Sequence, residues 1–444
     1  MTAAVQYLLD LPRFAGQAGS GYQPGLDRIR TLLATLGDPH RVQPVIHVAG
    51  TNGKGSTASM IAAMGQALGL RVGLHTSPHL HHLAERMRLN GVPAPLSWLD
   101  TAVERHRPAL EAAGLSFFEA TVALSFRYFA DMEVDLAVVE VGLGGRLDAT
   151  NVVEPVAAVL THIGLDHTAL LGATRAAIAR EKAGIIKERV PVVSAVDHPE
   201  AVPVIAEVAA GRRAPLHRLD EEVTWTADPT ATPHPLLQHV RTPQATYTDL
   251  ALDLPGRHQV RNALLALRTM EIVYRDQPGL ADAVRNGLAH TRRYAGLRGR
   301  AEVIRQQPSV LLDVGHNVDG LREALRVARG YGGESPPVVV LGLLRDKDAV
   351  GIGALLADSK SPVVVVGLDT ERGYGAAALA EALRATGASV IHEAPTVAQG
   401  LRWTLAQAHP DDVVLATGSH QVVAAVVAVL PGRGTEPTLQ IDPK

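Results

Sequence analysis

From about residue 45 onward, short apolar runs alternate with longer stretches that have the apolar spacing of helices. Several of the runs are apolar at every position, which is typical of central strands that a parallel sheet buries on both faces. This alternation predicts an α/β fold built on a parallel sheet. The first half is expected to contain strands at Val45–Val48, Arg71–His75, Leu136–Val141, Ala157–Thr161 and Val192–Ala195, and helices at Ser56–Leu68, Leu99–Ala113, Phe118–Asp131 and Thr174–Ile185.

Residues 220–255 break this rhythm, because they carry Thr, Pro, His and Asp with little helical periodicity. We expect short antiparallel strands and loops there, followed by a helix at 259–276. The Arg- and Gly-rich stretch near Ala295–Arg298 predicts an interdomain hinge. We therefore predict a P-loop-containing parallel-sheet ATPase domain at 1–295 and a smaller Rossmann-like α/β domain at 296–444, with strands at Ser309–Asp313, Pro337–Leu341, Val363–Val366, Val390–His392 and Val413–Ala416.

Residues 48–56 read Val-Ala-Gly-Thr-Asn-Gly-Lys-Gly-Ser, between a predicted strand and a predicted helix. A strand, a glycine loop and a helix make a cradle for nucleotide phosphates, because glycines let backbone N–H groups approach the anion and the helix N-terminus adds partial positive charge. Lys54 adds a full charge, so ATP with magnesium is the expected ligand. The alternative is a glycine-rich turn with a solvated lysine, since Gly55 follows Lys54 where the strict pattern has Ser or Thr.

Composition narrows the function classes. The chain has 444 residues and a net charge of −3, which argues against a nucleic-acid binder that relies on bulk charge. It has no cysteine, so disulfides, cysteine–zinc sites and cysteine nucleophiles are excluded. We find no basic segment followed by an apolar run at the N-terminus, and the apolar runs are too short to cross a bilayer. These features favour a cytoplasmic enzyme with no membrane partner.

Polar groups follow several predicted strands, and in open α/β sheets ligands bind at the carboxyl ends of strands. Glu140 ends one strand and opens the run Glu-Val-Gly-Leu-Gly-Gly-Arg-Leu-Asp-Ala-Thr-Asn. A carboxylate there could hold magnesium, which prefers oxygen ligands, or it could cap a helix or pair with Arg146. His167 follows another strand within Thr-His-Ile-Gly-Leu-Asp-His-Thr. It could be a metal ligand or proton carrier, or an ordinary polar turn residue.

Other candidate groups lie on a helix and near further strand ends. Lys182 sits late on a helix among apolar neighbours, where a buried lysine would need neutralisation or a partner; a solvent-facing lysine is the structural alternative. Ser77 offers a small oxygen ligand, and Arg86 offers a fork suited to a carboxylate or a surface ion pair. In the second domain, Asp313 could bind a ribose hydroxyl and Arg300 could reach phosphates.

Taken in order, several segments closely resemble folylpolyglutamate synthase, a family that in many bacteria also includes dihydrofolate synthase activity and belongs to the ATP-dependent Mur ligase superfamily. The resemblance spans about residue 24 to residue 425, and the run at 140–151 is its most diagnostic part. The segments that carry it are Gly-Thr-Asn-Gly-Lys-Gly-Ser, Thr-Ser-Pro-His-Leu, the run at 140–151, Gly-Leu-Asp-His, Glu-Lys-Ala-Gly-Ile, His-Gln-x-x-Asn-Ala and Asp-x-Gly-His-Asn.

The resemblance implies a role for individual positions. Lys182 matches the family lysine that is carbamylated by CO2, and together with Lys54 and His167 it would be catalytic. The remaining roles fall into three groups: ATP binding by Thr51, Asn52, Gly53, Lys54, Gly55, Ser56, Asn262, Arg300 and Asp313; magnesium binding by Ser77, Glu140 and His167; and substrate binding by Arg86, Phe118, Asp148, His316 and Ser419.

The reaction that the resemblance implies is amide formation. ATP phosphorylates a pterin carboxylate, and the amine of L-glutamate attacks the acyl phosphate. The expected partners are small molecules: dihydropteroate or reduced folates, and glutamate. The enzyme is expected to be a monomer, with the nucleotide between its domains. Two alternatives stay open: a cell-wall Mur ligase that acts on a UDP-sugar peptide, and a P-loop NTPase switch that ligates nothing.

Overall fold

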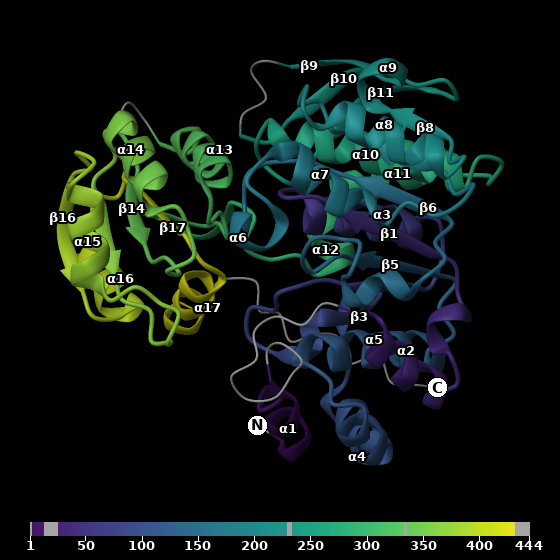
Figure 1. Ribbon diagram of the computed structural model, residues 1–444. Helices are drawn as coiled ribbons and strands as arrows, with labels where there is room; N and C mark the ends of the chain where they lie inside the picture. Colours follow the sequence, from purple (N-terminus) through teal and green to yellow (C-terminus); the bar gives the residue numbers. More distant parts are fainter. Residues whose placement is uncertain (1, 13–24, 229–232, 333–334, 431–444) are drawn as a thin grey trace. The chain divides into compact units, whose positions relative to one another are not determined.

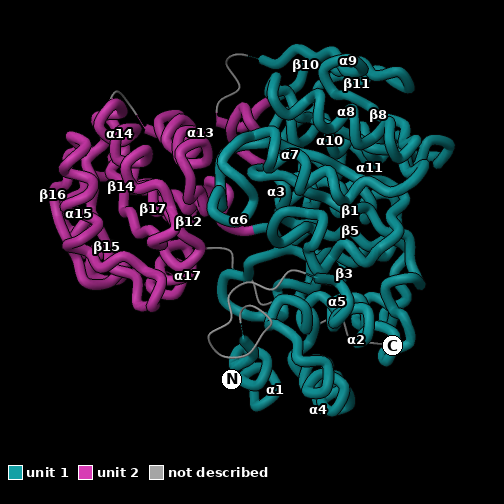
Figure 2. The backbone as a smooth tube through the Cα atoms, in the orientation of Figure 1, with its two compact units in different colours: residues 1–228, 236–253, 259–297 teal, residues 229–235, 254–258, 298–444 magenta. Residues whose placement is uncertain are grey.

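The computed structural model describes residues 2–12, 25–228, 233–332 and 335–430. It divides into two compact units, coloured separately in Figure 2. The first contains most of the chain up to Leu297. The second begins at Arg298 and also takes in Leu254–His258 and the described part of Pro229–Pro235.

The first unit is built on a mixed sheet that is parallel through its centre. Among the described residues its strand order is β4-β3-β2-β5-β1-β6-β7-β8, with β2, β5, β1, β6, β7 and β8 parallel and the β2–β3 and β3–β4 pairs antiparallel at one edge. The central strands are buried along their whole length, as their apolar runs predict. The strands are β1 (Val45–Ala49), β2 (Val72–His75), β3 (Met87–Leu89), β4 (Val92–Pro93), β5 (Leu136–Glu140), β6 (Ala157–Leu160), β7 (Val192–Ser194) and β8 (Leu216–Arg218).

Helices cover both faces of this sheet (Figure 1). Val45 and Ala49 of β1 point to the same face, because their positions differ by four and side chains alternate along a strand. Val45 belongs to an apolar core with α4 and α5, and Ala49 to one with α7 and α8. Helix α3 lies on the opposite face, where a Cβ added at Gly65 would lie 3.5 Å from Leu136 of β5.

The helices of the first unit range from single turns to seventeen residues. They are α1 (Ala3–Leu9), α2 (Asp27–Thr35), η1 (Pro39–Arg41), α3 (Lys54–Ala67), η2 (Leu83–Arg86), α4 (Leu96–Ala112), α5 (Phe117–Asp131), η3 (Ala149–Val152), α6 (Thr168–Leu171), α7 (Arg175–Ala183), α8 (Val202–Gly211), α9 (Leu219–Glu222), α10 (His258–Val273), α11 (Leu280–Ala289) and α12 (Thr291–Ala295).

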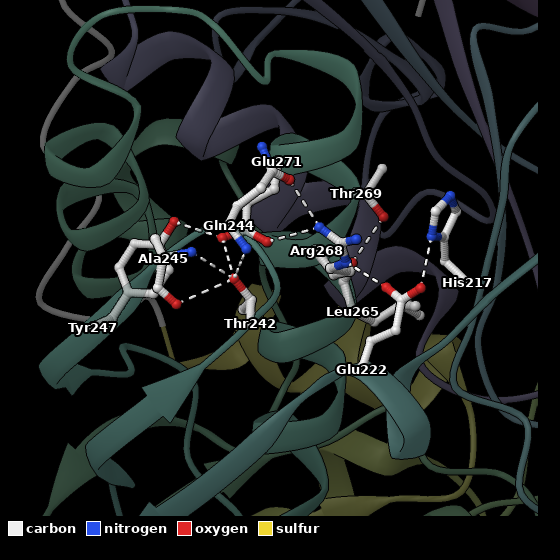
Figure 3. A network of polar contacts seen from close by, with 10 residues as sticks. All are labelled: His217, Glu222, Thr242, Gln244, Ala245, Tyr247, Leu265, Arg268, Thr269 and Glu271. Carbon is white, nitrogen blue, oxygen red and sulfur yellow. Dashed lines mark hydrogen bonds and ion pairs between the residues drawn. The ribbon is translucent and has the colours of Figure 1, made fainter.

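A small antiparallel sheet in the order β11-β10-β9 occupies the region without helical periodicity. Its strands are β9 (Thr224–Ala227), β10 (Leu236–Arg241) and β11 (Thr246–Ala251). Buried polar contacts tie it to α10 (Figure 3). Glu271 accepts hydrogen bonds from Thr242 Oγ1 at 2.7 Å, Tyr247 Oη at 3.0 Å and Arg268 Nη1 at 3.0 Å. Arg268 also donates its Nε to Glu222 at 2.7 Å, so its buried charge meets two carboxylates.

The second unit is a smaller α/β layer. Its strand order is β12-β13-β17-β14-β15-β16, parallel except for the β12–β13 pair. The strands are β12 (Glu302–Gln306), β13 (Ser309–Leu312), β14 (Val338–Leu341), β15 (Val363–Val366), β16 (Val390–Ala394) and β17 (Val413–Thr417); the helices are α13 (Val318–Arg329), α14 (Ala349–Ser359), α15 (Ala376–Arg384), α16 (Val397–Gln407) and α17 (His420–Val429).

The expected α/β fold with a parallel-sheet first half and a smaller α/β second half is confirmed. Each predicted strand is present to within one or two residues, and 220–255 forms antiparallel strands. The helix after the phosphate loop begins at Lys54, two residues before its predicted start. In the described part of the chain, no helix has both the length and the apolar character that a membrane crossing requires.

Replacing Glu271 with alanine is expected to leave the buried Arg268 guanidinium without one of its two carboxylates, and the Tyr247 hydroxyl without its acceptor. Removing one partner of a buried ion pair costs about 3–5 kcal/mol of unfolding free energy. Urea denaturation followed by circular dichroism measures the loss. Glu207→Ala is the control, because Glu207 pairs with Arg180 on the surface and its removal should leave the midpoint unchanged. Equal shifts in both variants would contradict the assignment.

Candidate functional site

The phosphate loop joins β1 to α3, and its last residue sets where the helix begins. Gly53 is the N-cap of α3 and has φ of 87°, a left-handed conformation that favours glycine. The helix therefore begins at Lys54 and directs its free N–H groups toward the loop. The Lys54 Nζ donates to the carbonyl of Thr51 at 3.1 Å, so its charge lies over the loop itself.

The start of α10 closes one side of the loop. A Cβ at Gly53 would lie 2.5 Å from Asn262 Oδ1, which leaves no room for a larger residue. Asn262 Nδ2 donates to Gln259 Oε1 at 2.9 Å, and Gln259 lies 3.5 Å from the buried hydroxyl of Ser56. The sequence indicated Asn262 but not Gln259, although Gln259 lies in the same His-Gln-x-x-Asn-Ala segment.

The end of β6 closes the other side. The backbone N–H of Thr51 donates to His162 O at 2.6 Å, and the Thr51 hydroxyl exchanges hydrogen bonds with the backbone of Gly164 at 3.0 and 3.1 Å. The hydroxyl of Thr161 donates to Asn52 O at 2.7 Å. These contacts hold Thr51 and Asn52 in the shape of a preformed anion cradle, and Thr161 is a second contributor that the sequence did not single out.

At the end of β5, Glu140 is buried and accepts a hydrogen bond from the backbone N–H of Ser77 at 3.1 Å. The structure thus brings together two of the three expected magnesium ligands. No group of three or more His, Cys, Asp or Glu side chains in the described ranges could hold a metal by itself. A carboxylate and a hydroxyl oxygen fit magnesium, which keeps several waters and shares its sphere with substrate phosphates.

His167 lies just after β6, which is hydrogen-bonded to β1. Its φ is 51°, and it is the N-cap of the short helix α6. The imidazole Nε2 lies 3.9 Å from Asp166 Oδ2, and the side chain is 35% exposed, so a ligand could reach the ring.

Lys182 lies buried on α7, with its side chain directed at the phosphate loop. Its Nζ donates to the carbonyl of Gly50 at 2.8 Å, directly after β1. Burial lowers the pKa of Lys182 to about 7, and the nearby charge of Lys54 acts in the same direction. Asp166 and Asp148 oppose the shift. A substantial fraction of this amine is therefore neutral at physiological pH.

The loop that follows Glu140 contains Asp148, one of the two expected pterin residues. The other, Phe118, lies on α5 and packs against this loop. Phe118 packs tightly on Gly142, where a Cβ would lie 2.4 Å from the ring. Asp148 is 5% exposed and accepts hydrogen bonds from the backbone N–H groups of Leu143 at 2.8 Å and Thr150 at 3.0 Å. Burial raises the pKa of Asp148, against these hydrogen bonds. Its contacts serve the fold of the loop, and its pterin contact stays a prediction.

Arg86 lies beside the end of β2, where its carbonyl accepts a hydrogen bond from the backbone N–H of Thr76 at 3.2 Å. Its Nε donates to His79 Nδ1 at 2.9 Å, and its guanidinium lies 4.9 Å from the centroid of the Phe117 ring. Burial lowers the pKa of His79 to about 4, with Arg86 acting in the same direction, so this imidazole is neutral and can accept. A buried guanidinium held this way suits an anionic substrate group.

The second unit carries four expected residues near neighbouring strands. Asp313 follows β13 and accepts from the backbone N–H groups of Ala301 at 2.9 Å and Gly315 at 2.7 Å. Burial raises the pKa of Asp313, and the charge of Arg300 opposes this. His316 lies 6.2 Å from His420 between ring centroids, next to Ser419, the N-cap of α17. Within this unit the loops after β13 and β17 are therefore adjacent.

Gly53→Ala tests whether the close approach of Asn262 matters. The added Cβ costs roughly 1–2 kcal/mol of backbone strain and displaces the Asn262 side chain. We expect kcat/KM for ATP to fall about ten- to hundredfold, the equivalent of one lost buried hydrogen bond. Gly37→Ala is the matched control, because Gly37 has φ of 83° but nothing within 4 Å of its Cβ position. Steady-state kinetics that fall equally in both variants would refute this role.

Two family models match most of the described chain. A model of the Mur ligase middle domain matches residues 48–270, and a model of the Mur ligase glutamate ligase domain matches residues 299–420. The first covers the phosphate loop and its neighbours, and the second covers most of the smaller unit.

Curated relatives extend this likeness. The chain is 38% identical to the Bacillus subtilis dihydrofolate synthase/folylpolyglutamate synthase over 342 residues, which cover 75% of this chain and 78% of that protein. It is 36% identical to a Haloferax volcanii protein named "Probable bifunctional folylpolyglutamate synthase/dihydropteroate synthase" over 431 residues, or 95% of this chain. The chain spans 49% of that longer relative.

Solved structures agree in fold. E. coli FolC in complex with DHPP and ADP superimposes with a TM-score of 0.83 at 31% identity, covering 96% of each chain. Mycobacterium tuberculosis folylpolyglutamate synthase complexed with ADP and AMPPCP gives 0.82 at 33% identity, covering 92% of this chain and 95% of that one. The chain therefore belongs to the folylpolyglutamate synthase/dihydrofolate synthase family of the Mur ligases.

Proposed function

We propose that this chain is an ATP-dependent ligase that joins L-glutamate to the carboxylate of a pterin or folate through an acyl phosphate. The observation that carries the proposal is the phosphate loop. The end of β6 and the start of α10 hold this loop in shape, and the side chains of Lys54 and Lys182 contact its backbone. The family relationship supports glutamate ligation to folate over both a UDP-sugar peptide ligase and a non-ligating NTPase switch.

The proposed reaction has two steps. A substrate carboxylate oxygen attacks the γ-phosphorus of ATP and ADP leaves, because a free carboxylate is too poor an electrophile for an amine. The glutamate amine then attacks the acyl carbon, loses a proton, and phosphate leaves. The protein mainly positions the reactants and neutralises charge. Lys54 and the backbone N–H groups at the start of α3 would stabilise the negative charge on the transferring phosphoryl group.

Ser77, Glu140 and His167 would hold magnesium, which neutralises charge on the β- and γ-phosphates when it is bound. Among the remaining proposed roles, Asn262, Arg300 and Asp313 would contact ATP. Arg86, His316 and Ser419 would contact glutamate, and Phe118 and Asp148 would lie by the pterin. Both dihydropteroate and reduced folates are proposed substrates, and a monomeric, cytoplasmic enzyme stays a prediction.

Lys182 is proposed to carry a carbamate formed with CO2. The neutral amine attacks the carbon of CO2 and loses one proton, which leaves an anionic carbamate where the unmodified side chain is an amine that protonation would make a cation. The product keeps one N–H, so the hydrogen bond to the Gly50 carbonyl can persist. This modification would remove the repulsion between Lys182 and Lys54, which lowers the pKa of Lys182 in the unmodified protein.

The ligase proposal is tested with ATP, glutamate and either dihydropteroate or tetrahydrofolate. We expect phosphate release to require both glutamate and a pterin acid, with the glutamylated product identified by mass spectrometry. Lys54→Ala is expected to abolish turnover with a normal circular dichroism spectrum, because the variant loses the charge that lies over the loop. Near-normal turnover in Lys54→Ala, or phosphate release that needs neither co-substrate, would refute the proposal.

The carbamate is tested by stripping CO2 from the enzyme at low pH and then restoring it. The neutral amine is the reactive form, so with a pKa of about 7 reactivation at fixed CO2 should slow roughly tenfold per pH unit below 7 and level off above that value. Lys182→Ala should show low activity at every bicarbonate concentration. Activity that never depends on bicarbonate, or a reactivation rate that is flat with pH, would argue against the modification.

A further inference from the structure

A chain of three buried side chains links β1 to the loop after β5. His47, in the middle of β1, is fully buried, and its Nε2 lies 2.8 Å from the hydroxyl of Thr150. That hydroxyl donates to Asp148 Oδ1, which also accepts from the backbone N–H of Thr150 at 3.0 Å. The sequence analysis did not single out His47 or Thr150.

The direction of these hydrogen bonds follows from counting protons. Thr150 has one hydroxyl hydrogen, and Asp148 Oδ1 takes it. His47 must therefore donate its Nε2–H to Thr150 Oγ1. Burial lowers the pKa of His47 to about 3, so the imidazole is neutral and carries its single hydrogen on Nε2. The chain of donation runs from His47 through Thr150 to Asp148.

The same loop is also fixed to the end of α7, by residues on either side of Asp148 and Thr150. The backbone N–H of Arg146 donates to Glu181 O at 2.8 Å, and the Asn151 side-chain amide donates to Gly184 O at 3.0 Å. Glycines make this approach possible: a Cβ at Gly145 would lie 2.8 Å from Glu181 O. The loop thus lies directly against the helix turn that carries Lys182.

The phosphate loop connects α7 back to β1. Lys182 donates to the carbonyl of Gly50, directly after β1, three residues beyond His47. β1 therefore contacts the loop after β5 through His47, and the residue that follows β1, Gly50, contacts α7 through Lys182. The loop after β5 also contacts α7 directly. We infer that His47 and Thr150 are positioning residues that, through Asp148 and the loop, set Lys182 at the phosphate loop of the proposed ligase.

The inference rests on the proposed function and predicts a specific pattern of variants. Thr150→Val removes the hydroxyl but leaves the two backbone hydrogen bonds to Asp148. His47→Leu removes the donor, whereas His47→Gln can place an amide N–H where Nε2–H was. We expect the first two to lower kcat about 10- to 100-fold, as misplacement of a reacting group does, with KM for ATP within about twofold. His47→Gln should recover most of the loss.

A second readout does not need turnover. With ¹³C-bicarbonate, the NMR signal of the Lys182 carbamate, identified by its absence in Lys182→Ala, should require a several-fold higher bicarbonate concentration in Thr150→Val and His47→Leu. His47→Gln should match the wild type. Thr404→Val is the matched control, because this buried threonine on α16 bonds only a helix carbonyl, Gly400 O, at 2.8 Å. It should change neither readout, and thermal unfolding of every variant reports on folding.

The outcomes separate the inference from the proposed function. Absence of ligase activity in the wild type would refute the proposed function, and the inference would fall with it. An active wild type whose Thr150→Val and His47→Leu variants keep normal kcat and normal bicarbonate dependence would overturn the inference alone. So would equal loss of activity in His47→Gln and His47→Leu, because a donor at Nε2 would then have no role. If the wild type is active but gives no carbamate signal, the inference is decided by the kcat of Thr150→Val and His47→Leu and by its recovery in His47→Gln.

Discussion

The buried amine of Lys182 constrains how the first unit can be arranged around the phosphate loop. A lysine that is 4% exposed, beside a loop that carries Lys54, is unfavourable as a cation, which is why its pKa is lowered to about 7. Two features of the surrounding structure stabilise the amine: the Gly50 carbonyl accepts its hydrogen bond, and the carboxylates of Asp148 and Asp166 favour its charged form. The loop after β5 and the turn before α6 supply those carboxylates, so both have to lie close to α7.

Strand order explains why segments far apart in the sequence can serve one site. β2, β5, β1 and β6 are consecutive in the sheet and parallel, so their carboxyl ends lie along one edge. Ser77, Glu140, the phosphate loop and His167 follow these four strands. A parallel sheet therefore places the segments that carry these groups along the same edge, although they lie far apart in the chain.

The sequence predicted the features that depend on local pattern. Wholly apolar runs located the central strands, and the spacing of glycines and Lys54 located the phosphate loop. It did not indicate β8, a strand of three half-buried residues whose position depends on pairing with β7. It also did not single out His47, or Gln259 within the His-Gln-x-x-Asn-Ala segment, because a single polar residue within an apolar strand or helix acquires its partners only through tertiary packing. The family resemblance implied a pterin contact for Asp148, yet the hydrogen bonds that it makes in the structure are those of a loop residue.

Helix α10 connects the small antiparallel sheet to the phosphate loop. Helix α10 carries Gln259 and Asn262 in its first turns and Arg268 and Glu271 near its far end, roughly 18 Å along the axis from Gln259 to Glu271 at 1.5 Å per residue. A rigid helix transmits displacement along its length. Sequence changes in β10 or β11 that shift Thr242 or Tyr247 are therefore expected to displace α10, and with it the Asn262 side chain against which Gly53 packs.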